Sequence, residues 1–192
     1  MINDNDIIEK RKEEIRKEIT RRLKGQEPSV KGERSLKIQK EVLASDEYTG
    51  SRTVMTYVPL PSEVDTRYLI GKAMEQGKRI AVPYVGYGDQ RIIACEFTAF
   101  EDLEKGPFGI EQPREGQLKV IPLKEIGLIV VPAIAYDEQN MRLGRGGGFY
   151  DRFLASGELS ASSTIGIAFS FQIVEHIPSA PHDRPVNRVV TD

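Results

Sequence analysis

Several residue types are scarce in this 192-residue chain, and each scarcity narrows what the protein can be. The chain has no tryptophan, two histidines and a single cysteine, Cys95, so no disulfide can form within it. Cys95 lies in the apolar stretch RIIACEF, which favours a buried packing residue over a reactive thiol. No apolar run approaches the ~20 residues that a membrane-spanning helix needs. The first residues, MINDNDIIEKRKEEIRK, lack the apolar core of a signal peptide.

The chain also has little net charge. Its 27 lysines and arginines nearly balance its 29 aspartates and glutamates, for a net charge of -2. Bulk charge therefore points neither to a nucleic acid nor to a membrane surface. The remaining composition, 39% hydrophobic and 29% charged, is ordinary for a globular protein with a sizeable core. We expect one domain over residues 1–192, in a cytoplasmic protein that binds neither nucleic acid nor membrane.

Helical and extended patterns alternate along the chain. Charge pairs at i,i+4 spacing and periodic apolar residues predict helices over 6–24, 33–45, 61–77 and 149–157. In the third of these, Ser62 is a candidate N-cap, Asp65 stands at the capping-box position and Gly77 is the stop signal.

Runs rich in β-branched and aromatic residues predict strands over 52–60, 78–85, 91–100, 126–137 and 163–171. The run IGLIVVPAIAYD, residues 126–137, is the most continuous apolar segment and is typical of a strand buried on both faces. A turn is expected at 86–90, a loop at 101–117 and a polar, proline-rich tail at 172–192. Strands that alternate with helices predict an α/β sandwich with a mostly parallel sheet and helices on both faces.

A glycine- and arginine-rich loop follows the longest apolar run. The stretch RLGRGGGFYDRFLA, residues 142–155, has four glycines and three arginines between Arg142 and Arg152. It leads into an expected helix, whose N-terminus favours anions. The glycines would let backbone amides approach an anion, while Arg142 and Arg145 could add bidentate contacts. A polyphosphate-binding loop is one hypothesis for this stretch.

Other interpretations of these residues stay open at this point. A glycine-rich stretch is as often a flexible turn, and a single RGG-like copy could contact RNA. The loop has neither the GxxxxGK[ST] pattern of a Walker loop nor the GxGxxG pattern of a dinucleotide site. Asp151 could complement a helix dipole or hold Mg²⁺ on a phosphate. Asp183, in PHDRP, could simply form a turn before Pro185.

The stretch RLGRGGGFYDRFL resembles the signature loop of the 5-formyltetrahydrofolate cyclo-ligases, also called methenyltetrahydrofolate synthetases. Four further segments are similar to parts of that family in the same order: SEVDT at 62–66, FGIEQP at 108–113, VPAIAYD at 131–137 and IGIAFSFQIVEHIPSAPHDRPVNRVVTD at 165–192. The resemblance implies a three-layer α/β/α sandwich related to the ribose-5-phosphate isomerase and CoA-transferase-like folds. That agrees with the alternation of strands and helices.

The resemblance also implies an enzyme that depends on ATP and Mg²⁺. It would convert 5-formyltetrahydrofolate to 5,10-methenyltetrahydrofolate and release ADP and phosphate, acting as a monomer on these small molecules. In such a reaction the formyl oxygen attacks the γ-phosphate, N10 attacks the activated carbon, and phosphate leaves as the ring closes. The alternatives are a nucleotide- or RNA-binding module without this activity, or a sugar-phosphate or CoA-ester enzyme of the same fold class.

By position, the resemblance assigns roles to particular residues. ATP contacts fall on Lys12, Arg16, Arg142, Leu143, Gly144, Arg145, Gly146, Gly147, Gly148, Phe149 and Tyr150. Folate contacts fall on Val58, Glu63, Arg145, Gly146, Gly147, Gly148 and Phe149. Asp151 and Asp183 would be associated with Mg²⁺, and Arg145 and Asp151 would be catalytic. Without the resemblance, Lys12 and Arg16 would be read as a solvated helix face. Tyr150 fits a ligand contact and a core aromatic almost equally well.

The chain departs from the family pattern at four positions. Asn187 stands where many relatives have aspartate, and Asn140 where glycine is usual. Phe149 replaces a frequent tyrosine, and Gly147 stands where some members carry lysine. None of these departures removes a residue assigned to the chemistry.

Overall fold

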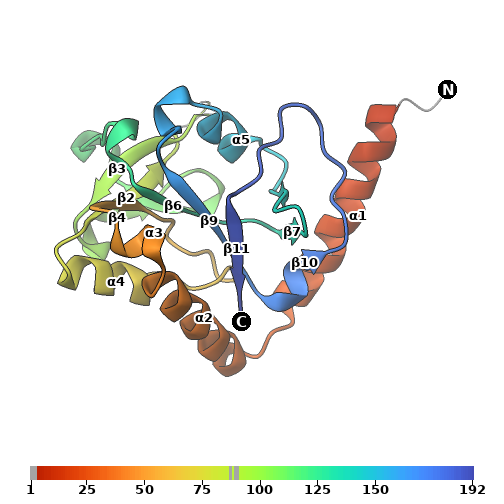
Figure 1. Cartoon of the computed structure of the whole chain (residues 1–192), viewed down its shortest axis with the longest axis horizontal. Coiled ribbons are helices and arrows are strands. Elements are labelled where there is room, and N and C mark those ends of the chain that lie inside the picture. Colours follow the sequence, from red (N-terminus) through yellow and green to blue (C-terminus); the bar gives the residue numbers. More distant parts are fainter. Residues whose placement is uncertain (1–3, 87, 89–90) are drawn as a thin grey trace.

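A six-stranded sheet forms the centre of the protein (Figure 1), in a computed structural model that describes residues 4–86, 88 and 91–192. The strand order is β11-β9-β6-β1-β2-β3. The strands are β11 (Arg188–Thr191), β9 (Ser163–Ala168), β6 (Leu128–Val131), β1 (Thr53–Met55), β2 (Arg79–Tyr84) and β3 (Ile93–Phe97). All neighbouring strands are parallel except β2 and β3. The turn expected at 86–90 falls largely outside the described residues.

Helices cover both faces of this sheet. The helices α1 (Asp4–Lys24), α2 (Pro28–Leu43) and α4 (Arg67–Glu75) pack on one face, and α3 (Asp46–Thr49) leads into β1. The short helix α5 (Phe149–Leu154) packs on the other face. Successive side chains of β6 point to opposite faces of the sheet. Leu128 and Val130 pack in the hydrophobic core under α1, α2 and α4, and Ile129 and Val131 pack in the core under α5. The predicted mostly parallel α/β sandwich is confirmed.

Two small sheets and several 3-10 turns complete the chain. One small sheet contains β7 (Ala135–Asp137), β8 (Arg142–Leu143) and β10 (Ile173–Val174), and the other is a hairpin of β4 (Leu103–Lys105) and β5 (Glu111–Pro113). The 3-10 turns are η1 (Phe100–Asp102), η2 (Pro107–Gly109), η3 (Glu115–Gln117), η4 (Leu123–Glu125), η5 (Gly157–Leu159) and η6 (Ser170–Gln172). In the described residues, no helix is both long enough and apolar enough to cross a bilayer.

The prediction of one strand over 126–137 is wrong. β6 ends at Val131, and the chain enters a second sheet as β7 at Ala135. Pro132 separates the two strands, because a proline cannot donate a ladder hydrogen bond. This break directs the chain out of the central sheet toward the glycine loop.

The predicted start of α4 at Ser62 is also wrong, because the helix begins at Arg67. The polar side chains before it tie down a loop instead: Glu63 accepts the N–H of Leu60, and the Thr66 hydroxyl donates to the Tyr57 carbonyl. At the other end, Gly77 adopts a φ of 70° directly after the helix, so the predicted stop is confirmed.

The segments expected to be loop or tail contain strands. Residues 101–117 include the β4–β5 hairpin, and the expected tail supplies β10 and the edge strand β11. β11 has only four residues beside a proline-rich stretch, which hid it in the pattern. Arg188 of β11 makes a bidentate contact with Glu47 of α3, at 2.8 and 3.1 Å. That contact lowers the pKa of Glu47 to about 2.

Close packing between the two sheets depends on Gly166 in β9. A Cβ there would lie 2.5 Å from Cζ of Tyr136, whose buried ring is held by a 2.7 Å hydrogen bond to the Val131 carbonyl. We expect Gly166→Ala to lower the free energy of unfolding by about 1–3 kcal/mol, because the core cannot absorb the methyl group. Urea unfolding measures this change.

A matched glycine lies in α4. Nothing stands within 4 Å of a Cβ at Gly71, so Gly71→Ala should stabilise the protein by about 0.5–1 kcal/mol through helix propensity. Equal effects of the two substitutions would contradict this account of the Tyr136 contact.

Candidate functional site

The glycine loop connects β8 to α5. Two of its glycines need the left-handed backbone: Gly146 has a φ of 100°, and Gly148, the N-cap of α5, has a φ of 63°. The residues Gly144 to Gly147 are exposed, whereas Arg142 and Leu143 before them are buried. The loop is therefore anchored at its base and open to solvent at its tip.

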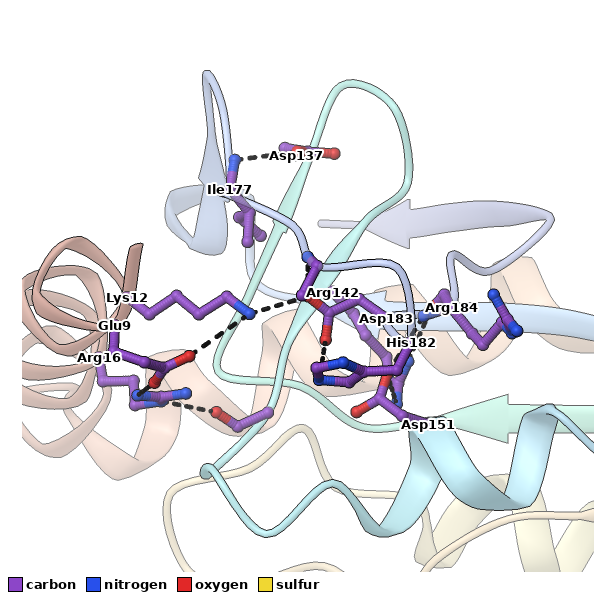
Figure 2. A network of polar contacts seen from close by, with 12 residues as sticks. Glu9, Lys12, Arg16, Asp137, Arg142, Asp151, Ile177, His182, Asp183 and Arg184 are labelled. Atoms are coloured by element: carbon purple, nitrogen blue, oxygen red, sulfur yellow. Dashed lines mark hydrogen bonds and ion pairs between the residues drawn. The ribbon is translucent and has the colours of Figure 1, made fainter. Parts of the chain in front are cut away.

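Arg142 is the anchor. Its guanidinium lies 2.9 Å from the carboxylate of Asp151 and donates to the Arg184 carbonyl at 2.6 Å, with only 3% of the side chain exposed. The N–H of Arg184 donates to the same Asp151 oxygen at 3.2 Å. Figure 2 shows these groups together, where β8, α5 and the C-terminal segment meet. Arg142 and Asp151, assigned to ATP and Mg²⁺ from the sequence, thus form one pair, in which Arg142 is buried and Asp151 is partly buried.

A second, largely buried pair joins the N-terminal helix to the C-terminal segment. Nζ of Lys12 lies 2.8 Å from Oδ2 of Asp183, with side-chain exposures of 7% and 12% (Figure 2). Oδ2 also accepts the N–H of Ala180 at 2.8 Å. Burial alone would raise the pKa of Asp183, but Lys12 and the Ala180 N–H outweigh it and lower the pKa below its usual range. The interpretation of Lys12 as part of a solvated helix face is wrong.

Arg16, one turn after Lys12, lies against the glycine loop. Its Nε donates to the Gly144 carbonyl at 3.1 Å, and its guanidinium stands 3.5 Å from Glu13 and 3.7 Å from Glu9. The carbonyl contact fixes α1 beside the loop. The sequence-predicted residues Lys12 and Arg16 are therefore both brought to the site.

The other side of the loop holds the residues assigned to folate. Arg145, half exposed, donates to Glu63 at 3.1 Å, and the second oxygen of Glu63 accepts the Leu60 N–H at 2.9 Å. The Phe149 ring meets Phe108 edge to face at 5.7 Å. Phe108 is 72% exposed and has a φ of 61°, at the tip of the β4–β5 hairpin. The hairpin thus brings an exposed aromatic ring to the loop.

Three of the predicted residues are placed differently from the rest. The side chains of Val58 and Leu143 are buried in the core on the α1 face of the sheet, where they contribute to packing. Tyr150 is half-buried, with its ring 6.4 Å from Phe153, and burial raises the pKa of its phenol well above the usual value. The Tyr150 ring also lies 5.9 Å from the Arg142 guanidinium, and its contact with ATP stays a prediction.

The two acids assigned to the metal, Asp151 and Asp183, both adjoin the peptide bond between residues 183 and 184. Asp151 accepts the N–H of Arg184, and Asp183 immediately precedes that residue. Within the part of the chain that the structure describes, no three His, Cys, Asp or Glu side chains group in a way that could hold a metal ion. Two carboxylates suit Mg²⁺, which keeps several waters and is usually completed by substrate phosphates.

Sequence reasoning missed two buried polar residues that shape the site. Asp137 is 2% exposed and accepts three backbone N–H groups, from Gln139, Met141 and Ile177, at 2.9–3.0 Å. Its signal was an aspartate at the end of an apolar run, followed by a polar turn. The turn needs a φ of 60° at Asn140, which explains why glycine or asparagine suits that position.

Gln172 is the second buried polar residue that sequence reasoning missed. Its amide donates to the carbonyls of Ala133 and Ile134 at 3.0 Å and accepts the N–H of Phe169 at 2.7 Å. A small internal cavity lies beside it and is lined by Leu23, Tyr57 and Glu63, among others. Gln172 therefore fixes the loop after β6 next to Glu63. Asn187, the missing third acid, instead accepts hydrogen bonds from the backbone and hydroxyl of Thr164.

The protein is thus an α/β sandwich with a mostly parallel sheet. Its arginine- and glycine-rich loop lies among paired acidic and basic side chains. The chain belongs to the 5-formyltetrahydrofolate cyclo-ligase family, whose sequence profile matches residues 8–192.

Its relatives support the same assignment. The chain is 29% identical to the 5-formyltetrahydrofolate cyclo-ligase of Mus musculus over 184 residues, which cover 92% of this chain and 91% of that protein. It is 30% identical to the cyclo-ligase of Escherichia coli (strain K12) over 142 residues, 73% of this chain and 78% of that one. The NMR structure of Aquifex aeolicus 5,10-methenyltetrahydrofolate synthetase matches with a TM-score of 0.78 at 28% identity, covering 94% of this chain and 89% of the other.

The Lys12–Asp183 pair gives a test of how α1 is held. We expect Lys12→Met to lower the free energy of unfolding by about 1–3 kcal/mol, because the Asp183 carboxylate stays partly buried without its cation. Hydrogen exchange of residues 178–184 should accelerate at the same time. The control is Lys17→Met, an exposed position on the same helix. Loss of the effect in an Asp183→Asn background would assign it to the pair, and simple additivity would contradict the coupling.

Proposed function

We propose that this protein, as one domain over residues 1–192, is a 5-formyltetrahydrofolate cyclo-ligase. It would form 5,10-methenyltetrahydrofolate from 5-formyltetrahydrofolate and ATP, with release of ADP and phosphate. The observation that carries the proposal is that segments far apart in the sequence come together at the glycine loop. Arg16 of α1 and Glu63 of the loop before α4 contact the glycine loop with their side chains, and the C-terminal segment contacts it through the Arg184 carbonyl. The C-terminal segment is also joined to α1 by the Lys12–Asp183 pair. Each of these segments carries a residue that the family resemblance assigns to a ligand.

The proposed binding of ATP is supported by the ion pairs that its predicted contact residues form. Lys12 and Arg142, which the proposal places near phosphates, are each paired with an acid that it places near Mg²⁺. A triphosphate would take over Lys12 and Arg16, and this exchange would free the Asp183 carboxylate. The exposed amides of Gly144 to Gly147 and the N-terminus of α5 would receive the remaining phosphate oxygens.

Mg²⁺, held by Asp151 and Asp183, would supply charge neutralisation on the phosphates. Both acids have hydrogen-bonding partners that fix their direction before any ligand binds: the Arg184 N–H for Asp151 and the Ala180 N–H for Asp183. Asp151 also lies 2.9 Å from the Arg142 guanidinium.

The folate side is supported by Glu63 and Arg145. The Glu63 carboxylate would accept N–H groups from the edge of the pterin ring. Arg145, the more exposed of the two, would then leave it and face the reacting formyl group. The formyl oxygen would attack the γ-phosphate as ADP departs. N10 would then attack the formyl carbon and lose its proton to solvent, and the carbon–oxygen bond would break as phosphate leaves. Arg145 would stabilise charge on the transferring phosphoryl group.

A monomeric state stays a prediction from the sequence. Cytoplasmic location and the absence of nucleic-acid binding stay predictions from the sequence. Among the relatives found, none supports a binding module without the ligase reaction.

The proposal is tested by mixing the protein with 5-formyltetrahydrofolate and MgATP and following the near-ultraviolet absorbance of the methenyl product. Product should appear only when both ATP and Mg²⁺ are present. In the same assay, Arg145→Ala should lower kcat roughly 10²–10³-fold, because a charge stabiliser is lost while the half-exposed side chain can be removed without unfolding. The absence of product with the wild-type protein would refute the proposal.

Two further variants complete this experiment. Arg114→Ala removes an exposed arginine outside the site and should leave kcat unchanged. Asp151→Asn, rather than alanine, keeps an acceptor for the buried Arg142 and should raise the Mg²⁺ concentration required for half-maximal rate. Near-normal kcat in Arg145→Ala would remove Arg145 from the catalytic assignment.

A further inference from the structure

Arg152 is an arginine of α5 to which the family resemblance assigns no role. It is exposed, and its Nη2 donates to the carbonyl of Gly147 at 2.7 Å. The contact runs back from the helix to the tip of the glycine loop, five positions earlier in the chain. Arg152 therefore lies beside the segment that the proposed function places on the phosphates of ATP.

We propose that Arg152 is a positioning residue for ATP, because it holds the carbonyl of Gly147 away from the phosphates and thereby turns the N–H of Gly148 toward them. This inference rests on the proposed function, since it concerns the backbone amides of the same loop. Arg152 acts on the nucleotide through one peptide bond only, the one between residues 147 and 148.

The geometry of a peptide bond links the two groups. In a trans peptide, the C=O group and the following N–H point in nearly opposite directions, and the described residues contain no cis peptide bond. Because the Gly147 carbonyl points at the Arg152 guanidinium, the N–H of Gly148 points away from it. Among the described residues, no acceptor is found for this N–H. The donor is thus available to an anion.

The peptide between residues 147 and 148 depends on such a contact, because glycines flank it on both sides. Reversing a peptide plane mainly changes ψ of the residue before it and φ of the residue after it. Gly148 has a φ of 63°, and glycine adopts negative φ values as readily as positive ones. In the reversed orientation, the negative end of the peptide dipole would face the phosphates and repel them. Arg152 therefore selects one of two orientations that the backbone itself allows.

The guanidinium of Arg152 is itself held by the loop. It lies 5.5 Å from the centre of the Phe149 ring, in a cation–π contact. A Cβ at Gly148 would stand 2.8 Å from Nη1 of Arg152, and a Cβ at Gly147 would stand 2.5 Å from the Phe149 ring. The two glycines thus leave the space that the ring and the guanidinium occupy. The same packing explains why glycine suits position 147, where some members of the family carry lysine.

Arg16 makes a similar contact at the other end of the loop tip, where its Nε donates to the Gly144 carbonyl at 3.1 Å. Arg16 belongs to α1 and is a predicted ATP contact, so a triphosphate would draw it away from the loop. Arg152 belongs to the helix that begins directly after the loop, and it can keep its hydrogen bond while a nucleotide binds. The peptide that Arg152 holds is therefore oriented both before and after binding.

The first test measures the Kd of ATP in the absence of folate by isothermal titration calorimetry. Arg152→Ala should raise this Kd roughly three- to tenfold, as expected for the loss of one hydrogen bond to a phosphate. The KM for 5-formyltetrahydrofolate should stay unchanged. The matched control is Arg114→Ala, which removes another exposed arginine that donates to a backbone carbonyl, that of Glu101 at 3.2 Å. This control should change neither quantity.

The second test observes the peptide directly by NMR spectroscopy of the ligand-free protein. The ¹³C shift of the Gly147 carbonyl reports its hydrogen bond, and the three-bond N–H to Hα couplings of Gly148 report its φ. Both should change in Arg152→Ala, while the carbonyl shift of Gly144 should not. Arg152→Lys keeps a cationic donor and should show smaller changes in the same direction, in these signals and in the Kd of ATP. It replaces Arg152→Ala if that variant does not fold.

An unchanged Kd for ATP in Arg152→Ala would overturn the proposal. A higher Kd with unchanged signals of Gly147 and Gly148 would also overturn it, because Arg152 would then contact the nucleotide directly. Weaker binding of both substrates together with a lower Tm would show a merely structural role and would count against it equally. The absence of ATP-dependent product with the wild-type protein would instead refute the proposed function, whatever the Kd values show.

Discussion

The buried guanidinium of Arg142 fixes the geometry on which the rest of the site depends. An arginine cannot shed its proton, so once it is buried it must keep its acceptors, and here these are the Asp151 carboxylate and the Arg184 carbonyl. The two acceptors come from α5 and from the C-terminal segment. One cation therefore holds three parts of the chain at the base of the glycine loop, while the exposed glycines beyond it stay accessible to a ligand.

A second fixed point is the carboxylate of Asp137, whose three backbone donors connect the turn before β8 with Ile177. The C-terminal segment is thereby held at Ile177 by Asp137 and at Arg184 by Arg142, and Asp183 lies between these points within reach of Lys12 on α1. The arrangement follows from satisfying buried polar groups, each of which would be costly if left unpaired. The site is a product of the same contacts that close the fold.

The sequence predicts the alternation of helices and strands well, because amphipathic spacing and β-branched runs are local properties. From glycines, arginines and a following helix it also predicts a loop at residues 142–148, which the structure shows exposed at its tip before α5; that this loop binds an anion stays a prediction. It fails where local signals compete. Polar residues around Ser62 form hydrogen bonds within a loop and do not cap a helix. The four residues of β11 are too few to give a recognisable strand pattern. Pairs such as Lys12–Asp183, 171 positions apart, have no local signal. Only the family resemblance placed their members in one site.

The pairing of each buried cation with an acid affects how fast a charged ligand can reach the site. Lys12 and Arg142 carry built-in counter-ions, as does the more exposed Arg145, so much of the local charge cancels within a few ångströms. Such a site projects a weak field into solvent and cannot draw an anion from a distance as an unpaired basic cleft does. A charged ligand would thus arrive at an ordinary diffusional rate that depends little on ionic strength, and attraction would grow only after contact, as the internal pairs open.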